Sequence, residues 1–582
     1  MKNNNNLKEL LIQAAALIKA KEFDEAIPVY EAILEIDDEN TKALTHLPVI
    51  FMMKKRFLEA VNMINKSFKV VKPEVSDYQN LATAYIELKD YNNAIKSYKK
   101  IIKINPKLTE VYKLLGDAQM EIPDHHGAFE SYKHALDLSP KNFDQLYDLG
   151  VVLEHLGNIT DSMDLLTEAI EIKPNHVECN NRLASCLSAN GEYKEANIIY
   201  KKLMEWLPES ASVRVDYSSN LLYQGKYDEA EKIVTEMLIK NPTIHRAKLN
   251  LSFLHLHKKN FSEGWKYFDA RLYVRNSIDK SVRFDIVKKN LDIDVDTKSL
   301  KASDKILILL DGGLGDVILG FSMLKAFHKK YSNISAEVDF RLISLAKRSF
   351  PDVQFYPISS HNHDILIKHN FSQFDKAIYW LSLGKYVRQD IESFPKKPIG
   401  FLKADTNNTN KIKNKLKRDK KIVCGISWKS SAAEGAHKST KLESLVPILS
   451  NKDIKFLDLQ YETEINFGQT AVEKENIKIN RNIIIEEYQG IDKFMDIDGL
   501  ASLISNCDII VTTSNVTAHL AGGLGIKTYL FVPFSRGRLW YWHDNNGVSI
   551  WYPSIRVFRA ESPGEWGDIF EKIAKEMVQE VN

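Results

Sequence analysis

A repeat with a period of 34 residues runs through the first half of the chain and restricts its fold more than any other feature. Small residues return at this interval in eight copies: Ala26, Ala60, Ala94, Ala128, Ser162, Ala196, Ala230 and Gly264. An aromatic residue or its equivalent stands three positions before each of them, as Phe23 does before Ala26. A lone helix pair cannot bury its apolar face, so successive pairs must stack into one continuous core.

A 34-residue period built from two helical stretches resembles that of tetratricopeptide (TPR) repeats. About eight repeats over residues 1–275 predict a superhelix with a concave groove, which favours binding of an acceptor protein. The alternative is a scaffold that only dimerises the chain or supports its partner domain. The candidate groove residues, each one position before an aligned core residue, are Asn80, Asp148, Arg182, Asp216 and Asn250.

The composition excludes several classes of partner. Lys and Arg number 79 against 77 Asp and Glu, so no global field attracts nucleic acid or membrane. Four cysteines without metal-ligand spacing indicate reduced, buried thiols and a cytoplasmic protein. The polar N-terminal sequence does not resemble a signal peptide, and no apolar run approaches the roughly 20 residues of a membrane span.

The pattern changes near residue 304, after a polar stretch over 276–303 that we interpret as a linker. An apolar strand, Lys305–Leu310, leads through the glycine-rich turn Asp311–Asp316 into a helix, Val317–Phe327. Strand, glycine turn and helix in this order open a parallel α/β sheet. Further strands are predicted at Glu337–Leu342, Val353–Pro357 and Lys376–Trp380.

A basic, Asn-rich stretch over 403–421 has no apolar period and is interpreted as a second linker. It separates a lobe at 304–402 from a second strand-led lobe at 422–582. The second lobe contains predicted strands at Ile422–Trp428, Lys455–Gln460, Asp508–Thr513 and Thr528–Val532, and a closing helix at Trp566–Val578. Two similar α/β halves with a cleft between them are typical of a two-lobed transferase.

Six motifs in the second half carry a resemblance to a known enzyme family. They are Gly312-Gly-Leu-Gly-Asp316, Ser427-Trp-Lys429, Asp458-Leu-Gln-Tyr461, Asp498-Gly-Leu500, Thr513–Gly522 and Trp551–Arg559. Together with the repeats, they resemble bacterial TPR–glycosyltransferase fusions related to the heptosyltransferases. The resemblance implies a GT-B fold of two Rossmann-like lobes. Some proteins of this plan are flagellin glycosyltransferases, which transfer a nonulosonic acid such as pseudaminic or legionaminic acid.

The resemblance implies that Asp316, at the end of the loop with Gly312, Gly313 and Gly315, is the general base of an inverting transfer. The alternative is that Asp316 only caps the helix that follows. A phosphate cradle is expected at the helix N-terminus over Ser514–His519, where the amides favour an anion. His519 is alternatively a buried structural histidine.

The candidate donor-binding residues lie in the second lobe. They are Trp428, Lys429, His437, Lys438, Gln460, Ser514, Asn515, Thr517, His519 and Arg538. Lys438 is the first choice for a cation at the leaving phosphate, although a solvated loop lysine would look the same. Many relatives have Asp where this chain has Ser514. Trp540 and Trp551 would either stack on the donor or pack between the lobes.

The sequence therefore predicts a cytoplasmic protein O-glycosyltransferase. It would use a nucleotide sugar, with CMP as one candidate carrier, and transfer to Ser or Thr of flagellin. No cofactor and no metal site are expected. Heptosyl or hexosyl transfer to another protein or glycan is one alternative, and a binding scaffold with an inactive GT-B domain is another. A homo-oligomer is left open.

Overall fold

The computed structural model describes residues 2–274, 300–358, 370–416, 422–430, 435–462, 468–534, 539–562 and 565–581. Contacts divide the chain into two compact units. The first contains residues 1–190 and 198–203, and the second contains residues 191–197 and 204–582. Of the predicted linker at 276–303, only residues 300–303 are among the described residues. Arg538 lies outside the described residues.

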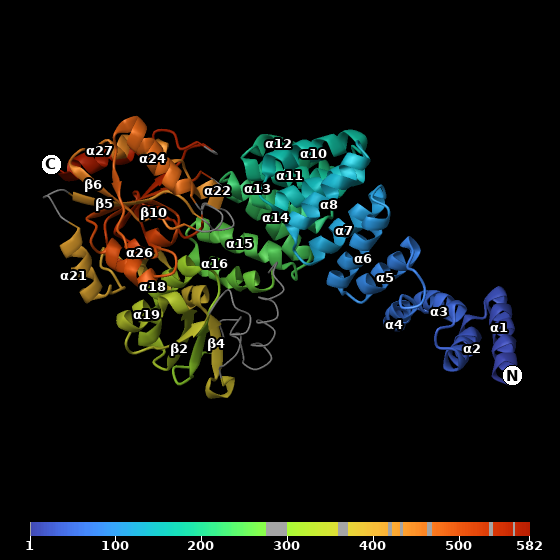
Figure 1. Ribbon diagram of the computed structural model, residues 1–582. Coiled ribbons are helices and arrows are strands. Elements are labelled where there is room, and N and C mark those ends of the chain that lie inside the picture. The colour runs from blue at the N-terminus through green and yellow to red at the C-terminus, as the bar shows by residue number, and fades with distance from the viewer. Residues whose placement is uncertain are drawn as a thin grey trace. The chain divides into compact units, whose positions relative to one another are not determined.

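The first half of the chain folds into antiparallel helix pairs, as the 34-residue period predicts (Figure 1). The helices of the first unit are α1 (Lys2–Ala20), α2 (Phe23–Ile36), α3 (Thr41–Met53), α4 (Phe57–Ser67), α5 (Val75–Glu87), α6 (Tyr91–Ile104), α7 (Thr109–Glu121), α8 (His125–Leu138), α9 (Phe143–His155), α10 (Ile159–Ile172) and α11 (Val177–Asn190). Helix α12 (Tyr193–Trp206) contributes residues to both units. The repeated small residues are buried, as Ala26, Ala60 and Ala94 show.

The second unit begins with the remaining repeat helices and continues into two α/β sheets. These helices are α13 (Ala211–Tyr223), α14 (Tyr227–Lys240), α15 (His245–His257) and α16 (Phe261–Phe268), and a 3-10 turn, η1 (Asp269–Leu272), follows them. Helix α16 packs against the first sheet, because Trp265 and Phe268 belong to one core with it. The last repeat is thus part of the α/β body.

The first sheet contains four parallel strands among the described residues, in the order β3-β2-β1-β4. Its strands are β1 (Ile306–Leu309), β2 (Ile334–Asp339), β3 (Gln354–Ile358) and β4 (Lys376–Tyr379). Its helices are α18 (Leu314–Lys330), α19 (Ile343–Ser349) and α20 (Gly384–Val387). The strand, glycine turn and helix predicted at 305–327 are confirmed.

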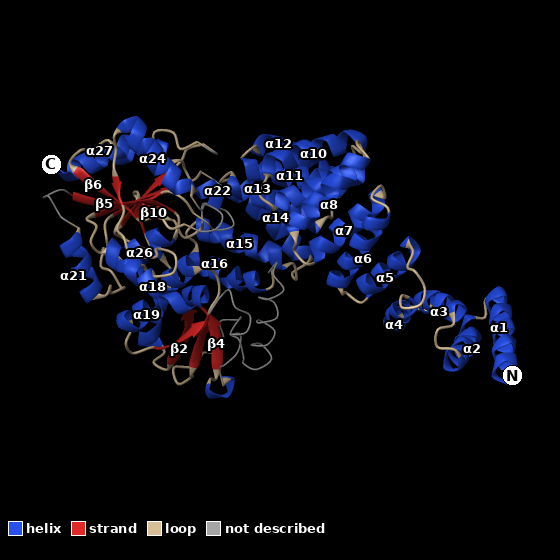
Figure 2. Ribbon diagram, in the orientation of Figure 1, coloured by secondary structure: helices blue, strands red, loops and turns tan. Residues whose placement is uncertain are grey.

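Within the described ranges, the second sheet has eight strands in the order β10-β11-β12-β9-β8-β5-β6-β7. They are β5 (Ile422–Ser427), β6 (Ile454–Asp458), β7 (Ile485–Glu486), β8 (Ile509–Thr513), β9 (Thr528–Val532), β10 (Asp544–Asn545), β11 (Val548–Ser549) and β12 (Ile555–Arg559). Figure 2 shows its strands as a group separate from those of the first sheet. Strands β12 to β7 are parallel, and β10 and β11 form an antiparallel edge.

The helices around the second sheet are α22 (Gly435–Lys438), α23 (Val446–Leu449), α24 (Gln469–Arg481), α25 (Ile497–Ile504), α26 (Val516–Leu524) and α27 (Ile569–Val581). The stretch at 403–421, predicted to be a linker without an element, instead contains helix α21 (Thr406–Lys415). Asp405 caps this helix and Ile412 is buried. None of the helices in the described ranges is long and apolar enough to cross a lipid bilayer.

Asp148 on α9 offers a test of the packing in the first unit. Its carboxylate is half-buried, with Lys113 Nζ 3.5 Å from Oδ2. Burial raises the pKa of Asp148 to about 6, against the attraction of Lys113. A raised carboxyl pKa means that the folded state holds the proton more tightly, so this group stabilises at low pH and loses that stability as pH rises to 6.

We therefore expect Asp148→Asn to stabilise the first unit at pH 7 by about 1–3 kcal/mol relative to the unmodified chain. The difference should shrink towards pH 4, where Asp148 is protonated. Native-state hydrogen exchange of the α9 amides measures this difference in stability. The control is Asp144→Asn, which changes an exposed aspartate on the same helix. Equal protection of both variants at pH 7 would contradict the burial argument.

Candidate functional site

The site begins at the loop between β1 and α18, where Asp316 lies in the first turn of the helix. Its Oδ2 accepts a hydrogen bond of 2.9 Å from the Gly313 amide, so the predicted capping role is observed. Burial raises the pKa of Asp316, the Gly313 hydrogen bond opposes this, and Asp311 raises it further. Lys438 and Arg271 lower the same pKa. The capping bond uses only one of the two carboxylate oxygens.

The N-terminus of α26, a helix that packs on the second sheet, contacts this loop. The ring of His519 lies so close to Gly315 that a Cβ there would stand 2.7 Å from His519 Cδ2. His519 Nδ1 is 2.9 Å from the Tyr552 hydroxyl. Burial, aided by Lys438, lowers the pKa of His519 to about 3, so the imidazole is neutral at physiological pH. His519 is therefore buried and neutral, and it lies where the N-terminal turns of α18 and α26 meet.

Lys438, at the end of α22, lies near Asp316 and His519. Its side chain is buried, and its backbone carbonyl accepts a hydrogen bond from the Thr513 hydroxyl at the end of β8. Its charge affects the pKa of both Asp316 and His519. Three of the predicted site residues thus gather from both sheets around the ends of α18 and α26. Each helix N-terminus favours negative charge at this place.

Several predicted donor-binding side chains are engaged inside the second sheet instead. Gln460 Oε1 accepts hydrogen bonds from the Ser427 hydroxyl, the Trp428 amide and the Lys429 amide at 3.1, 2.9 and 2.8 Å. Asn515 Nδ2 donates to Ser427 Oγ and to the Lys429 carbonyl at 2.7 and 3.1 Å. Gln460 and Asn515 therefore brace the end of β5.

Trp428 and Lys429 both contact Glu473 on α24. The Trp428 ring is fully buried, and its Nε1 donates to Glu473 Oε2 at 2.7 Å. Lys429 Nζ lies 2.8 Å from Glu473 Oε1. The motif Ser427-Trp428-Lys429 thus fixes the strand end in this structure, with Trp428 a core residue.

The remaining predicted residues have different surroundings. Ser514 Oγ accepts a hydrogen bond of 2.8 Å from Trp542 Nε1. The Thr517 hydroxyl is buried without a hydrogen-bond partner in the described part of the chain. His437 is half-buried on α22. Among the described residues, no group of three or more His, Cys, Asp or Glu is arranged to hold a metal ion.

The tryptophans proposed to stack on the donor pack within the second unit. Trp540 lies 5.4 Å from both Trp265 and Phe268, measured between ring centroids, and 5.9 Å from Trp551. Trp551 also meets Phe394 edge to face at 4.7 Å. Trp551 therefore packs between the two predicted lobes, whereas Trp540 packs against the last repeat helix.

Sequence reasoning missed four residues of this region. Tyr552 makes a hydrogen bond with His519, and Trp542 donates one to Ser514. Asp311 and Arg271 form an ion pair beside the glycine loop. The acidic residues at both ends of Asp311-Gly-Gly-Leu-Gly-Asp316 were a usable signal. Nothing in the sequence marked Arg271, because its partner lies 40 residues away.

The predicted groove residues are mostly paired with neighbouring repeats. In the first unit, Arg182 Nη1 lies 3.0 Å from Glu154 Oε2, and Asp148 faces Lys113, as described above. Asn80 is half-exposed. In the second unit, Asn250 Nδ2 donates to the hydroxyls of Ser218 and Ser219, both at 2.9 Å. These residues therefore stabilise the stacking of repeats.

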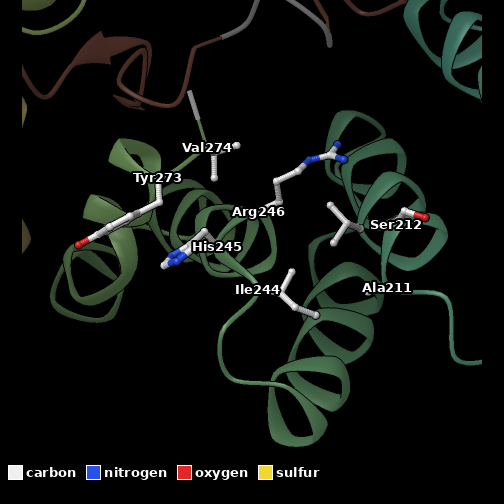
Figure 3. Close-up of a pocket in the computed structure, with 8 residues that line it drawn as sticks. Ala211, Ser212, Ile244, His245, Arg246, Tyr273 and Val274 are labelled. Carbon is white, nitrogen blue, oxygen red and sulfur yellow. The ribbon is translucent and has the colours of Figure 1, made fainter. Parts of the chain in front are cut away.

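A pocket of about 390 Å³ lies in the second unit, at the start of α13 and α15, and Asp216 pairs with one of its lining residues, Arg246 (Figure 3). Arg246 Nη2 lies 2.6 Å from Asp216 Oδ1. The rings of His245 and Tyr273 stack at a centroid distance of 4.3 Å. The pocket lining is Ala211, Ser212, Val215, Ile244, His245, Arg246, Tyr273 and Val274. This apolar hollow with a cationic edge lies on the repeat helices.

Comparison with known families identifies the repeats. Residues 77–108 and 113–177 match tetratricopeptide repeat families, in agreement with the period. A similar curated protein is Protein FlbA of Caulobacter vibrioides, which is 26% identical over 329 residues. The match covers 54% of this chain and 51% of FlbA, so the chain spans about half the length of this relative.

Two of the solved structures to which parts of this chain are similar are described as TPR proteins. One is YrrB, described as a TPR protein with an unusual peptide-binding site, at 21% identity and a TM-score of 0.26, covering 28% of this chain and 86% of YrrB. Another is the C-terminal part of a TPR repeat-containing protein from Cytophaga hutchinsonii, at 17% identity and a TM-score of 0.35. It covers 41% of this chain and 98% of that structure.

The contact between Gly315 and His519 offers a test of the site's geometry. We expect Gly315→Ala to destabilise the second unit by about 1–3 kcal/mol, because the new methyl must displace a buried ring. Gly313→Ala is the matched control, since a Cβ there meets nothing closer than 3.9 Å. Thermal unfolding of the full chain measures both. Equal transition temperatures for the two variants would show that the loop and α26 do not meet.

Proposed function

We propose that this chain is a glycosyltransferase of GT-B type that modifies a protein acceptor bound by its repeats. The proposed reaction transfers a nonulosonic acid from a nucleotide donor to Ser or Thr of flagellin, with inversion and without a metal. The meeting of Asp316, Lys438 and His519 from the two sheets carries this proposal. Loops at the carboxyl ends of strands β1 and β8 are where ligands bind to parallel sheets.

Each of the three residues suits one part of such a transfer. Asp316 has a raised pKa, so its carboxylate is a stronger base than an exposed one. The acceptor hydroxyl would lose its proton to Asp316 as its oxygen attacks the sugar. Lys438 and the amides at the start of α26 would stabilise the leaving phosphate, and neutral His519 would donate a hydrogen bond without adding charge.

The acceptor side of the proposal depends on the repeats. Solenoids present extended surfaces that bind protein segments. The pocket beside Arg246 and Asp216 belongs to the same unit as Asp316, so an acceptor segment bound there would be held by the body that contains the base. The flagellar part of the proposal comes from the resemblance of the sequence motifs to flagellin glycosyltransferases.

A binding scaffold with an inactive GT-B domain is the second candidate. It is favoured by the internal hydrogen bonds of Gln460 and Asn515, which occupy two predicted donor ligands. The Ser514 hydroxyl is likewise occupied by a hydrogen bond from Trp542. A scaffold would bind the acceptor and leave its mass unchanged.

The variant Asp316→Asn separates these candidates. Asparagine keeps an oxygen for the Gly313 amide, so the helix cap and the fold should persist. Transfer should fall by about 10²–10⁴, the contribution of general-base catalysis. Intact-mass analysis of flagellin after incubation with the full chain and CMP-activated sugar measures this.

The control is Asp90→Asn, which changes another helix-capping aspartate, in the repeat array. It should leave transfer unchanged, and both variants should still retain flagellin in a pull-down. Near-normal transfer by Asp316→Asn would show that this residue only caps the helix.

The donor site has its own test. We expect Lys438→Met and His519→Gln each to weaken nucleotide binding by about 1.5–3 kcal/mol, the value of a charge-assisted hydrogen bond. Calorimetric titration of the full chain with CMP measures this, and titration with UDP, GDP and ADP examines the hexosyl and heptosyl alternatives. Exposed Lys441→Ala is the control. Unchanged affinity in both variants would place the phosphate elsewhere.

A further inference from the structure

The loop after β1 contains Asp311, whose carboxylate is bound by Arg271 at the end of the repeat array. Asp311, two residues beyond β1, is buried, and its Oδ2 accepts hydrogen bonds from Arg271 Nε and Nη2 at 3.2 and 2.8 Å. Arg271 belongs to η1, directly after the last repeat helix. On the other side, the Leu310 amide donates to Glu337 Oε2 at 2.9 Å. The start of the glycine loop is therefore fixed from two directions.

Arg271 is part of a compact buried group with balanced charge. Its Nη1 lies 2.6 Å from Asp269 Oδ1, and its Nη2 donates to the Ser382 hydroxyl at 2.9 Å. Lys385 pairs with the other oxygen of Asp269. Two cations thus face the two carboxylates of Asp269 and Asp311. Removing one member of such a group leaves an uncompensated buried charge.

The charges of this group affect the pKa of Asp316, which lies five residues after Asp311. Asp311 raises the pKa of Asp316, and Arg271 lowers it. The other charged or titratable groups around Asp316 come from the second sheet. They are Lys438, which lowers the pKa of Asp316, the neutral His519 against Gly315, and Tyr552, whose own pKa is raised by burial and by Asp316. Without Arg271, the charge on Asp311 would act on Asp316 unopposed.

We infer that Arg271, supplied by the end of the repeat array, is a positioning residue for the glycine loop, holding Asp311 and shielding Asp316 from its charge. The inference rests on the proposed function, since it assigns Asp316 the role of base. The repeats then complete the catalytic loop as well as binding the acceptor.

The test compares Arg271→Gln, Asp311→Asn and the double variant in the full chain, with kcat/KM for flagellin modification measured from pH 5 to 9. Arg271→Gln removes a cation that lowers the pKa of Asp316, so the acid limb of the kcat/KM profile should move to higher pH. The loss of kcat/KM should then be about tenfold larger at pH 6 than at pH 8. In Asp311→Asn, the limb should move to lower pH. The double variant should restore the original limb, because both the charge and its shield are gone.

The control is Arg341→Gln, which breaks a similar buried pair in the same sheet, where Arg341 Nε lies 2.8 Å from Asp339 Oδ1. A purely structural loss lowers the rate equally at every pH. An unshifted limb in Arg271→Gln, or a shift of equal size in Arg341→Gln, would overturn the inference.

Thermal unfolding of the same variants gives a readout that does not need activity. The double variant should lose less melting temperature than the sum of the two single losses, because the pair acts as a unit. Additive losses would overturn the inference even if transfer is observed. Absence of transfer by the unmodified chain would instead contradict the proposed function, and with it the role assigned to Arg271.

Discussion

The rest of the second unit depends on the buried joint between the last repeat and the first sheet. The Trp265 ring covers Gly384 so closely that a Cβ there would stand 2.3 Å from Cζ2, and its Nε1 donates to the Arg388 carbonyl at 2.6 Å. Next to this apolar contact lies the Arg271–Asp311 pair. Packing and charge therefore fix η1 against the sheet at the point where the chain enters the glycine loop.

Because of this joint, the repeats and the α/β sheets are not simply two tethered modules. The compact second unit begins within the repeat helices, near residue 191, and the last repeats belong to the body that carries Asp316. A cut between the repeats and the sheets would expose Trp265 and Phe268 and leave the Asp311 charge buried without its partner. Experiments on function accordingly require the full chain.

The features that the sequence predicted are local or periodic. The repeat helices follow from a 34-residue period, and β1, the glycine turn and α18 follow from apolar runs around Gly312. The helix at 406–415 was missed because its single buried residue, Ile412, produces no apolar period. Its stability comes from the Asp405 cap and from tertiary contact.

Within the site, the sequence identified Asp316, Lys438 and His519 but not what surrounds them. Burial of Trp428 and the brace formed by Gln460 depend on which strands are neighbours, and a motif does not encode this. Likewise, Tyr552 contacts His519 from 33 residues away. Such contacts arise from the strand order, so they became visible only in the folded chain.

We propose that this fold transfers a sugar to flagellin, and the intact mass of flagellin from cells with and without this gene measures that transfer. We expect flagellin to carry an added mass equal to one or more nonulosonic acid residues only when the gene is present. The same mass in both strains, with flagellin still retained by the purified chain, would contradict the transfer and leave a binding scaffold.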